Sequence, residues 1–334
     1  MTLVFYLRIG QDRAPSRNFL MHAMQFSSGD VVIDRRFDYA RMLDDNGDSA
    51  AAADLMEQAL EMAPLWTAGW LNLAHYREKA GDKGGAIAAL QHLLALDPED
   101  IFAAKLKLAL LGAVEVPDQP PTAYVEALFD DYAERFEDAL VEKLDYSIPE
   151  KLGALLERTV PSSIPFVLAV DLGCGTGLLG PEIRGKVDRL EGFDLSANML
   201  AKAEEKAIYD HLGQADLTQD AAQSGLFNDV LPEFRASLAC AADVMIYLGN
   251  LEAAFELVMR LTSPRAVFAF SVEDSGADEG FDLAPSLRYR HSKPYVETLL
   301  GQFGFETLAT ERTAIRKDGG EDVPGILFVA RKHA

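Results

Sequence analysis

A glycine-rich turn between an apolar run and a helical pattern constrains this chain more than any other feature. In the stretch VLAVDLGCGTGLLG, residues 167–180, Asp171 is followed by Gly173, Gly175 and Gly177. Glycine lacks a Cβ, so its backbone adopts conformations that let a ligand approach closely. A turn of this kind between a strand and a helix is where nucleotides and nucleosides bind. The turn therefore predicts a parallel sheet with a ligand site at the carboxyl ends of its strands.

Downstream of the turn, β-rich runs alternate with helical patterns, which is typical of a doubly wound, mainly parallel sheet. The predicted strands are Phe166–Leu172, Leu190–Asp194, Tyr209–Ala215, Ser237–Ile246, Ala266–Val272, Phe305–Arg316 and Gly325–Lys332. Helical patterns lie at Leu178–Arg184, Ala197–Ala207, Leu251–Leu261 and Pro294–Phe303. The last two strands are joined by KDGGEDVP, which leaves no room for a helix, so we expect one antiparallel edge strand.

The N-terminal part of the chain contains an internal repeat with a period of 34 residues. DNGDSAAAADLMEQALEMAP at 45–64 aligns with KAGDKGGAIAALQHLLALDP at 79–98, and the glycine, aspartate, alanine and proline positions match. Gly-Asp suits a turn between paired helices, alanines let the helices approach closely, and proline stops the second helix. Together with Trp70, Leu73 and Ala74, this pattern resembles the tetratricopeptide repeat (TPR). A generic helical bundle is the alternative.

These patterns divide the chain into four parts. We predict an N-terminal extension at 1–32, α-helical TPR repeats at 33–112, a linker at 113–121 and an α/β domain at 122–334. The linker prediction rests on GAVEVPDQPP, because its prolines do not fit a regular element. Two repeats are fewer than the roughly three that usually stand alone, so we expect the repeats to pack on the α/β domain.

Composition and charge narrow the range of partners. The formal net charge is −22, and a surface of that sign repels polyanions, so we expect no nucleic-acid partner. No apolar run reaches the roughly 18 residues that a membrane span needs, so no membrane partner is expected. The cysteines, Cys174 and Cys240, are too few for a disulfide framework or a zinc site. We therefore predict a cytoplasmic protein without a metal site.

The spacing of the glycines distinguishes between two ligand classes. The dinucleotide fingerprint is G-x-G-x-x-G, but here Gly177 comes one residue early and Leu178 stands in the expected place. The pattern D-x-G-x-G-x-G instead resembles the first motif of class I S-adenosylmethionine-dependent methyltransferases. The resemblance implies the Rossmann-like α/β fold of that class, a seven-stranded, mainly parallel sheet with one antiparallel edge strand.

The same resemblance implies S-adenosyl-L-methionine as the cofactor and S-adenosylhomocysteine as its product. The turn residues that it assigns to cofactor binding are Asp171, Gly173, Cys174, Gly175 and Gly177. Cys174 is interpreted as a small buried filler of the turn rather than as a nucleophile. Methyl transfer needs alignment and a base when the acceptor carries a proton, but no metal or covalent intermediate.

Two downstream aspartates strengthen this resemblance. Asp194 ends the next predicted strand about twenty residues after the turn, where a carboxylate accepts both ribose hydroxyls. The L-S-x-x-M-L-x-x-A pattern that follows, and Asp216 in GQADL, also resemble the family. They imply that Met199 lies against the adenine, that Asp216 lies where the adenine amino group binds, and that Leu195 belongs to the cofactor site. A helix-capping role for Asp194 and a turn role for Asp216 are the alternatives.

An aromatic helical stretch precedes the α/β pattern. The segment FDDYAERF, residues 129–136, resembles the N-terminal lid of small-molecule methyltransferases. That resemblance implies that Tyr132 approaches the methionyl end of the cofactor. A packing stripe is the alternative, because Phe129, Tyr132 and Phe136 are spaced three and four residues apart.

The acceptor side is predicted from the segments after the fourth and fifth strands. AADVMIYLGN places Asp243, Tyr247 and Asn250 there, and we predict Tyr247 as a catalytic residue. A core position for Tyr247 and a strand-end cap for Asp243 are the alternative. His291 is the predicted general base, because imidazole titrates near neutrality. For His291 a solvent-facing or helix-capping role is the alternative.

Two further features qualify the resemblance. Y-R-H-S-K from Tyr289 to Lys293 matches the Tyr-x-x-x-Lys pair of short-chain dehydrogenases, but that pair needs a helix and Pro294 follows directly, so we interpret it as coincidence. From about Met24 onwards the chain resembles bacterial TPR-linked methyltransferases, whose substrates are poorly defined. Asn250 departs from the aspartate expected after YLG, which puts a charged role there in doubt.

Three functions remain in competition. The first is an enzyme that methylates a small molecule, with the repeats as a packing arm, a homodimer contact or a dock for a protein partner. The second is a protein methyltransferase in which the repeats hold a peptide or protein substrate. The third is a non-catalytic TPR scaffold that retains the cofactor fold. The intact Asp171, Asp194 and glycines argue against the third.

Overall fold

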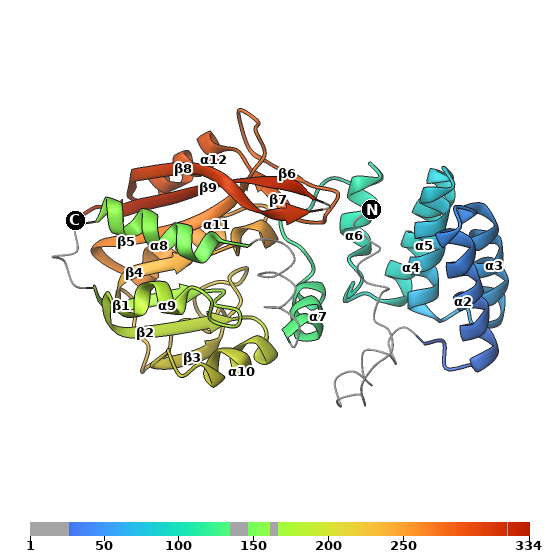
Figure 1. Ribbon diagram of the computed structural model, residues 1–334, viewed down its shortest axis with the longest axis horizontal. Helices are drawn as coiled ribbons and strands as arrows, with labels where there is room; N and C mark the ends of the chain where they lie inside the picture. Colours follow the sequence, from blue (N-terminus) through green and yellow to red (C-terminus); the bar gives the residue numbers. More distant parts are fainter. Residues whose placement is uncertain (1–26, 134–145, 161–165, 319) are drawn as a thin grey trace. The chain divides into compact units, whose positions relative to one another are not determined.

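The computed structural model describes residues 27–133, 146–160, 166–318 and 320–334, without the side chains of Asp131 and Tyr132. The described residues fall into two compact units that divide within helix α7 (Thr122–Tyr132), between Ala127 and Leu128. We call them the repeat unit and the α/β unit (Figure 1). The domain boundary that the sequence predicts at residue 122 stays a prediction.

The repeat unit consists of helices joined by short turns. Its helices are α2 (Val31–Asp45), α3 (Ser49–Met62), α4 (Thr67–Lys79), α5 (Lys83–Leu96) and α6 (Ala104–Leu110). Asp48 caps α3 by accepting the Ala51 amide at 3.0 Å, and Asp82 caps α5 by accepting the Gly85 amide at 2.8 Å. These two equivalent caps confirm the helical repeat, because each follows a glycine with positive φ in the turn between paired helices.

The last helix of the repeat unit, α6, begins at Ala104. Asp100 and Ala103 both adopt left-handed backbone conformations, with φ of 56° and 54°, so no helix extends through them. The buried carboxylate of Asp100 accepts the amides of Ala104 at 2.5 Å and Lys105 at 3.0 Å. Capping from Asp100 therefore sets the start of α6.

The α/β unit is built on one twisted sheet. Its strands are β1 (Phe166–Leu172), β2 (Val187–Asp194), β3 (His211–Gln214), β4 (Ala236–Ala241), β5 (Thr262–Asp274), β6 (Phe281–Leu283), β7 (Tyr289–His291), β8 (Phe305–Asp318) and β9 (Glu321–Lys332). The parallel part runs in the order β3-β2-β1-β4-β5, and β9 is antiparallel to β5. This arrangement confirms the predicted Rossmann-like α/β class.

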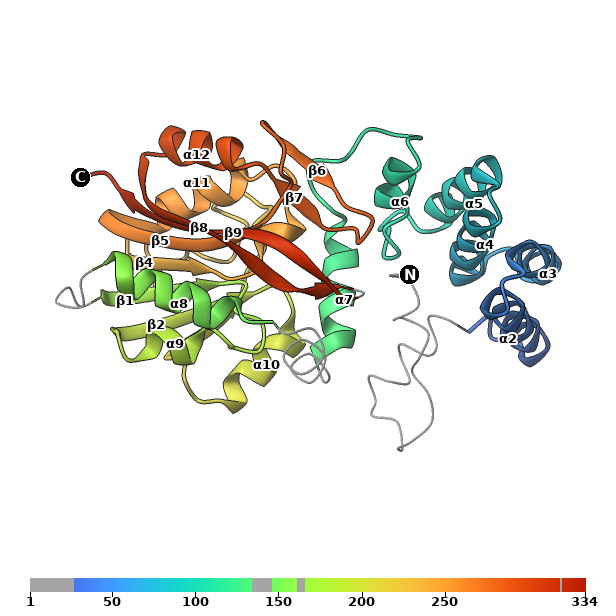
Figure 2. The ribbon, with the colours of Figure 1, turned by 45° about the horizontal axis from the view of Figure 1, so that its top comes forward.

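The antiparallel strand does not lie at the edge of the sheet. Strand β9 lies between β5 and β8, and it pairs with both of them along most of its length. Strands β8 and β9 form a long twisted pair (Figure 2). The short strands β6 and β7 were not expected from the sequence, and they pair antiparallel beside the end of β5.

Helices cover both faces of the sheet. They are α8 (Ile148–Thr159), α9 (Gly180–Arg184), α10 (Ala197–Glu205), α11 (Glu252–Leu261) and α12 (Lys293–Gln302), with a 3-10 turn η4 (Met245–Tyr247). On β5, Phe268 and Phe270 pack with residues of α11 and α12, whereas Val267 and Ala269 pack with residues of α8 and α9. Both faces are buried, so the central strands are apolar throughout rather than alternating.

Two sequence expectations about local structure are settled by this topology. Tyr289 lies on β7 and Lys293 begins α12, so the Tyr-x-x-x-Lys pair shares no helix, as the interpretation of coincidence requires. The fourth strand ends at Ala241 rather than at Ile246, because Asp243 has a φ of 59° and the chain turns into η4. Within the described residues, no helix is long and apolar enough to cross a membrane.

Candidate functional site

The glycine turn after β1 requires glycine at several positions. Gly173, Gly175 and Gly177 have φ of 62°, 54° and 84°, a region that other residues rarely adopt. A Cβ at Gly173 would overlap the side chain of Val244, and one at Gly177 would lie 2.9 Å from the ring of Tyr209. The turn is therefore tightly enclosed from two sides, and the spacing seen in the sequence has a steric cause.

Asp171 lies at the end of β1, beneath the turn, and is 1% exposed. Its Oδ2 accepts a hydrogen bond of 2.7 Å from the hydroxyl of Tyr209. Burial raises the pKa of Asp171 to about 7, an effect that the Tyr209 hydrogen bond opposes and the neighbouring Asp194 carboxylate reinforces. Asp171 and Asp194 are therefore a pair of buried acids at the edge of the turn, and the charge of Asp194 raises the pKa of Asp171.

Asp194 ends β2 next to the turn and holds it in place. Its Oδ2 accepts the Gly175 amide at 2.8 Å, and its Oδ1 accepts the Ser196 amide at 2.9 Å. Burial raises the pKa of Asp194 to about 6, although these amides and that of Leu195 favour the ionised form. These amides do not use all of the lone pairs of the carboxylate, so it can still accept a further donor.

The start of α10 joins this pair of acids to helix α7. Ser196 caps α10, because its Oγ accepts the Met199 amide at 3.1 Å, and the same hydroxyl donates to Asp130 at 2.6 Å. The side chain of Asn198 donates to the carbonyl oxygen of Asp130 at 3.2 Å. Met199 itself is fully buried. Side-chain hydrogen bonds therefore hold the last turn of α7 to the start of α10.

Asp216 follows β3 and lies in a local turn. Its Oδ1 accepts the amide of Thr218 at 2.9 Å and the Thr218 hydroxyl at 2.6 Å. Its Oδ2 accepts Gln219 Nε2 at 3.2 Å and retains one lone pair. The turn role that the sequence left open is thus present, and the adenine role of Asp216 stays a prediction.

On the opposite side of the turn, a buried ionic group connects β4, β5 and β8. The guanidinium of Arg316, only 3% exposed, lies 3.2 Å from Asp243 Oδ2 and also pairs with Glu273. The backbone amide of Asp243 donates to Ser271 Oγ at 2.8 Å. Asp243 is held in a left-handed conformation by these contacts, and such strained residues often occur at functional sites.

Several aromatic side chains lie near this ionic group. The rings of Tyr247 and Phe129 meet edge to face with centroids 5.0 Å apart, and Arg288 hydrogen-bonds to Tyr247. Tyr146 is buried, and its burial, reinforced first by Asp243 and also by Asp171, raises the pKa of its phenol. Tyr146 therefore lies within electrostatic reach of both the glycine turn and the Asp243 group.

His291 is fully buried at the end of β7. Its Nε2 lies 2.9 Å from the carbonyl oxygen of Leu248 and 3.0 Å from that of Gly249, so this nitrogen donates to the backbone after η4. Burial lowers the pKa of His291 to about 4. The Nδ1 atom has no hydrogen-bond partner within the described part of the chain. Neither the solvent-facing nor the helix-capping alternative describes this position, and the base role stays a prediction.

Comparison with known families identifies the α/β unit. Residues 144–310 match the methyltransferase domain family. The chain belongs to that family. Residues 68–100 match the tetratricopeptide repeat, which confirms the interpretation of the second repeat, and no curated protein matches the chain as a whole.

Several solved methyltransferase structures resemble the methyltransferase domain in fold. A 1,6-didemethyltoxoflavin-N1-methyltransferase from Burkholderia thailandensis shares 17% identity over 66% of this chain and 94% of its own, with a TM-score of 0.49. A methyltransferase from Clostridium acetobutylicum shares 17% identity over 62% and 100%, with a TM-score of 0.45. The magnesium protoporphyrin IX methyltransferase of Synechocystis shares 18% over 55% and 81%, with a TM-score of 0.41.

The structure brings some of the predicted site residues together, and others lie outside the described residues. The predicted turn residues, Asp194 and Leu195 lie together, whereas the side chains of Tyr132 and Phe136 lie outside the described residues. Asn250 accepts the Glu252 amide at 2.9 Å near the start of α11, a role that needs no charge. No sequence motif pointed to Tyr209, Arg316 or Glu273 as residues of the site. A signal existed for the last two, because charged residues at the ends of predicted buried strands need partners.

Proposed function

We propose that the methyltransferase domain transfers a methyl group from S-adenosyl-L-methionine to a small-molecule acceptor and releases S-adenosylhomocysteine. The observation that carries this proposal is the carboxylate of Asp194. It lies at the carboxyl end of β2, where it accepts the amides of Gly175 and Ser196 and keeps capacity to accept a further donor. The hydroxyls of a vicinal diol such as that of ribose are donors of this kind.

The residues around the turn fit this cofactor. Thr176, within the turn, is 2% exposed, and its hydroxyl has no hydrogen-bond partner among the described residues, so a bound ligand would satisfy it. The residues that we assign to the cofactor are Asp171, Gly173, Cys174, Gly175, Gly177, Asp194, Leu195, Met199, Asp216 and Tyr132. When bound, S-adenosylmethionine supplies an electrophilic methyl group, and the protein supplies alignment and excludes water.

We place the acceptor at the carboxyl ends of β4 and β5, where ligands of open α/β sheets bind. Tyr247 and Asp243 face this region from the segment after β4, and Arg288 adds a cation beside Tyr247. These groups can orient a polar small molecule by hydrogen bonds. His291 acts as the base in this proposal only through its Nδ1, since its Nε2 is engaged by backbone carbonyls.

Calorimetric titration with S-adenosylmethionine and S-adenosylhomocysteine tests the cofactor assignment. We expect micromolar binding by the full chain and a loss on the order of 100-fold in Asp194→Ala, because two hydrogen bonds to an ionised acceptor disappear. Asp188→Asn is the matched control. Asp188 lies exposed at the other end of the same strand, and its substitution removes the same charge. Absence of binding at millimolar ligand contradicts the proposal.

The TPR match favours a second candidate, a protein acceptor docked by the repeats. The two candidates differ in where a transferred methyl group ends up. With methyl-labelled S-adenosylmethionine, the full chain and separated cell fractions, label in the low-molecular-weight fraction supports a small-molecule acceptor. Label retained in acid-precipitated protein supports the second candidate, provided that Asp194→Ala abolishes it.

A further inference from the structure

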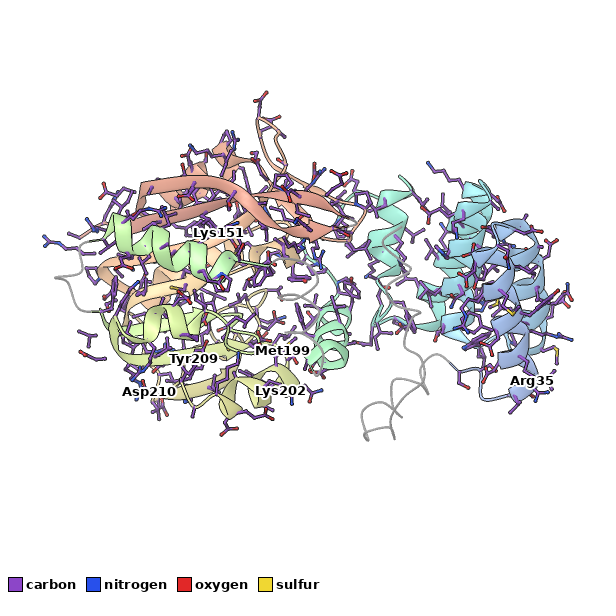
Figure 3. The ribbon with its side chains drawn as sticks, in the orientation of Figure 1. Arg35, Lys151, Met199, Lys202, Tyr209 and Asp210 are labelled. Carbon is purple, nitrogen blue, oxygen red and sulfur yellow. The ribbon has the colours of Figure 1, made fainter. Side chains whose placement is uncertain are left out.

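Tyr209 lies between α10 and β3, outside all of the motifs that the sequence made conspicuous (Figure 3). Its ring occupies a space that three glycines leave open. A Cβ on Gly177 of the turn, Gly180 of α9 or Gly192 of β2 would lie 2.9 to 3.2 Å from an atom of this ring. Real Cβ contacts are rarely so short, so a side chain at any of the three would displace the ring. The ring therefore supports the turn from beneath.

The hydroxyl of Tyr209 is directed to the acid at the end of β1. It donates to Asp171 Oδ2 at 2.7 Å, and within the described part of the chain this is the one hydrogen bond to that carboxylate. Asp171 pairs in register with Gly192 on β2, next to the Tyr209 ring. The same side chain thus supports the turn by packing and restrains its acid by a hydrogen bond.

The other groups that face Asp171 do not stabilise its charge. The titratable groups within electrostatic reach are Asp194 on β2, Cys174 in the turn, Cys240 on β4 and Tyr146 before α8. Each of them is acidic or neutral, so no cation among them offsets a carboxylate at Asp171. Tyr209 is the group that lowers the pKa of Asp171, against burial and the Asp194 charge.

We propose that Tyr209 is a positioning residue for the cofactor, which keeps the glycine turn in shape with its ring and holds the Asp171 carboxylate as an anion with its hydroxyl. The proposal rests on the proposed function, because S-adenosylmethionine carries a sulfonium and an ammonium, and a fixed negative charge beneath the turn favours such a ligand. Tyr209 itself acts through Asp171.

The affinity of the full chain for S-adenosylmethionine, measured from pH 6 to pH 8.5, tests this role. Tyr209→Phe keeps the ring and removes the donor, so the pKa of Asp171 rises by about one unit. From a starting pKa of about 7, the ratio of wild-type to variant affinity is then about ninefold at pH 6, about fivefold at pH 7 and close to one at pH 8.5. The ratio cancels titration of the ligand.

Tyr295→Phe is the matched control. Its hydroxyl also takes part in a hydrogen bond, accepting the Leu251 amide at 3.0 Å, but it lies on α12 and should give a ratio that does not change with pH. A pH-independent ratio for Tyr209→Phe, whether large or near one, overturns the proposal, because packing alone would produce it. If the wild type does not bind, the proposed function fails instead.

A double variant keeps the test decisive if Tyr209→Phe alone fails to fold. Asp171→Asn removes the charge that the hydroxyl satisfies, so Tyr209→Phe combined with Asp171→Asn leaves no unpaired buried carboxylate. We expect this double variant to bind with the same affinity as Asp171→Asn alone at every pH, within about twofold. A further loss of tenfold or more in the double variant would show that Tyr209 acts independently of Asp171 and would refute the inference.

Discussion

The guanidinium of Arg316 on β8 lies 3.2 Å from the carboxylate of Asp243, a residue in left-handed conformation directly beyond β4. The same guanidinium pairs with Glu273 on β5. This contact fastens the antiparallel β8–β9 pair to the carboxyl ends of the parallel strands. An ion pair between segments far apart in the sequence therefore helps to position the wall of the proposed acceptor site.

Removing the cation from this group should destabilise the α/β unit strongly. Arg316→Met removes the cation that pairs with the buried Glu273 and the partly buried Asp243, and we expect a loss of about 3 to 5 kcal/mol in the free energy of unfolding. Arg312→Met is the control, because Arg312 is 66% exposed and pairs with Asp274, so its loss should stay within about 1 kcal/mol.

Urea denaturation followed by circular dichroism measures this effect, and tryptophan fluorescence separates the two units. Both tryptophans, Trp66 and Trp70, belong to the repeat unit, so their transition should stay unchanged in Arg316→Met. Equal stability of the two arginine variants would mean that the buried group contributes no more than a surface ion pair.

The raised pKa of Asp171 predicts a pH-dependent effect of neutralising it. Folding raises this pKa from an ordinary value of 3.8 to about 7. Between these pH values the folded state binds more protons at Asp171 than the unfolded state does. The free energy of unfolding therefore falls as the pH rises from about 4 to about 7. Asp171→Asn should therefore stabilise the protein relative to wild type at pH 8, on the order of 2 kcal/mol or more, and not at pH 4. Thermal unfolding at both pH values measures the difference, and an equal effect at both would contradict the prediction.

Glycine at 173 should be required for both folding and binding. Gly173→Ala forces a Cβ into Val244 at a φ of 62°, and we expect a loss of about 2 to 4 kcal/mol in stability together with weaker cofactor binding. Gly185→Ala is the control, because its φ is −69° and a Cβ there meets nothing within 4 Å. Denaturation and calorimetry on the two variants check this, and a Gly173→Ala protein that matches Gly185→Ala would exclude the steric argument.

Ser196 should link helix α7 to the end of β2. Ser196→Ala removes the cap of α10 and the hydrogen bond to Asp130, and we expect a cost of about 1 kcal/mol in stability. It should also speed hydrogen exchange at residues 128–132. Ser292→Ala removes the equivalent cap of α12, which accepts the Tyr295 amide at 3.3 Å, without touching α7. If both variants change exchange in α7 alike, the link does not exist.

Much of the site was accessible from short-range patterns. The turn glycines, the Asp48 and Asp82 caps and the order of strands and helices depend on residues within a few positions of one another. Asp194 was predictable for the same reason, since a strand of ordinary length fixes its distance from the turn. The glycine turn and Asp194 lie within residues 144–310, the part of the chain that matches the methyltransferase domain family.

Other features required the folded chain. The pairing of β9 between β5 and β8, the burial of His291 against the carbonyls of Leu248 and Gly249, and the Tyr209–Asp171 hydrogen bond join residues that are distant in sequence. Which residues meet in these contacts depends on the strand order of the sheet and on close packing, and no local sequence pattern encodes either. By itself the sequence determined a TPR segment and a glycine turn of the methyltransferase type. Only the tertiary structure decided which buried acids receive a partner, because burial makes a charge costly and a partner must arrive from whichever strand or helix packs beside it.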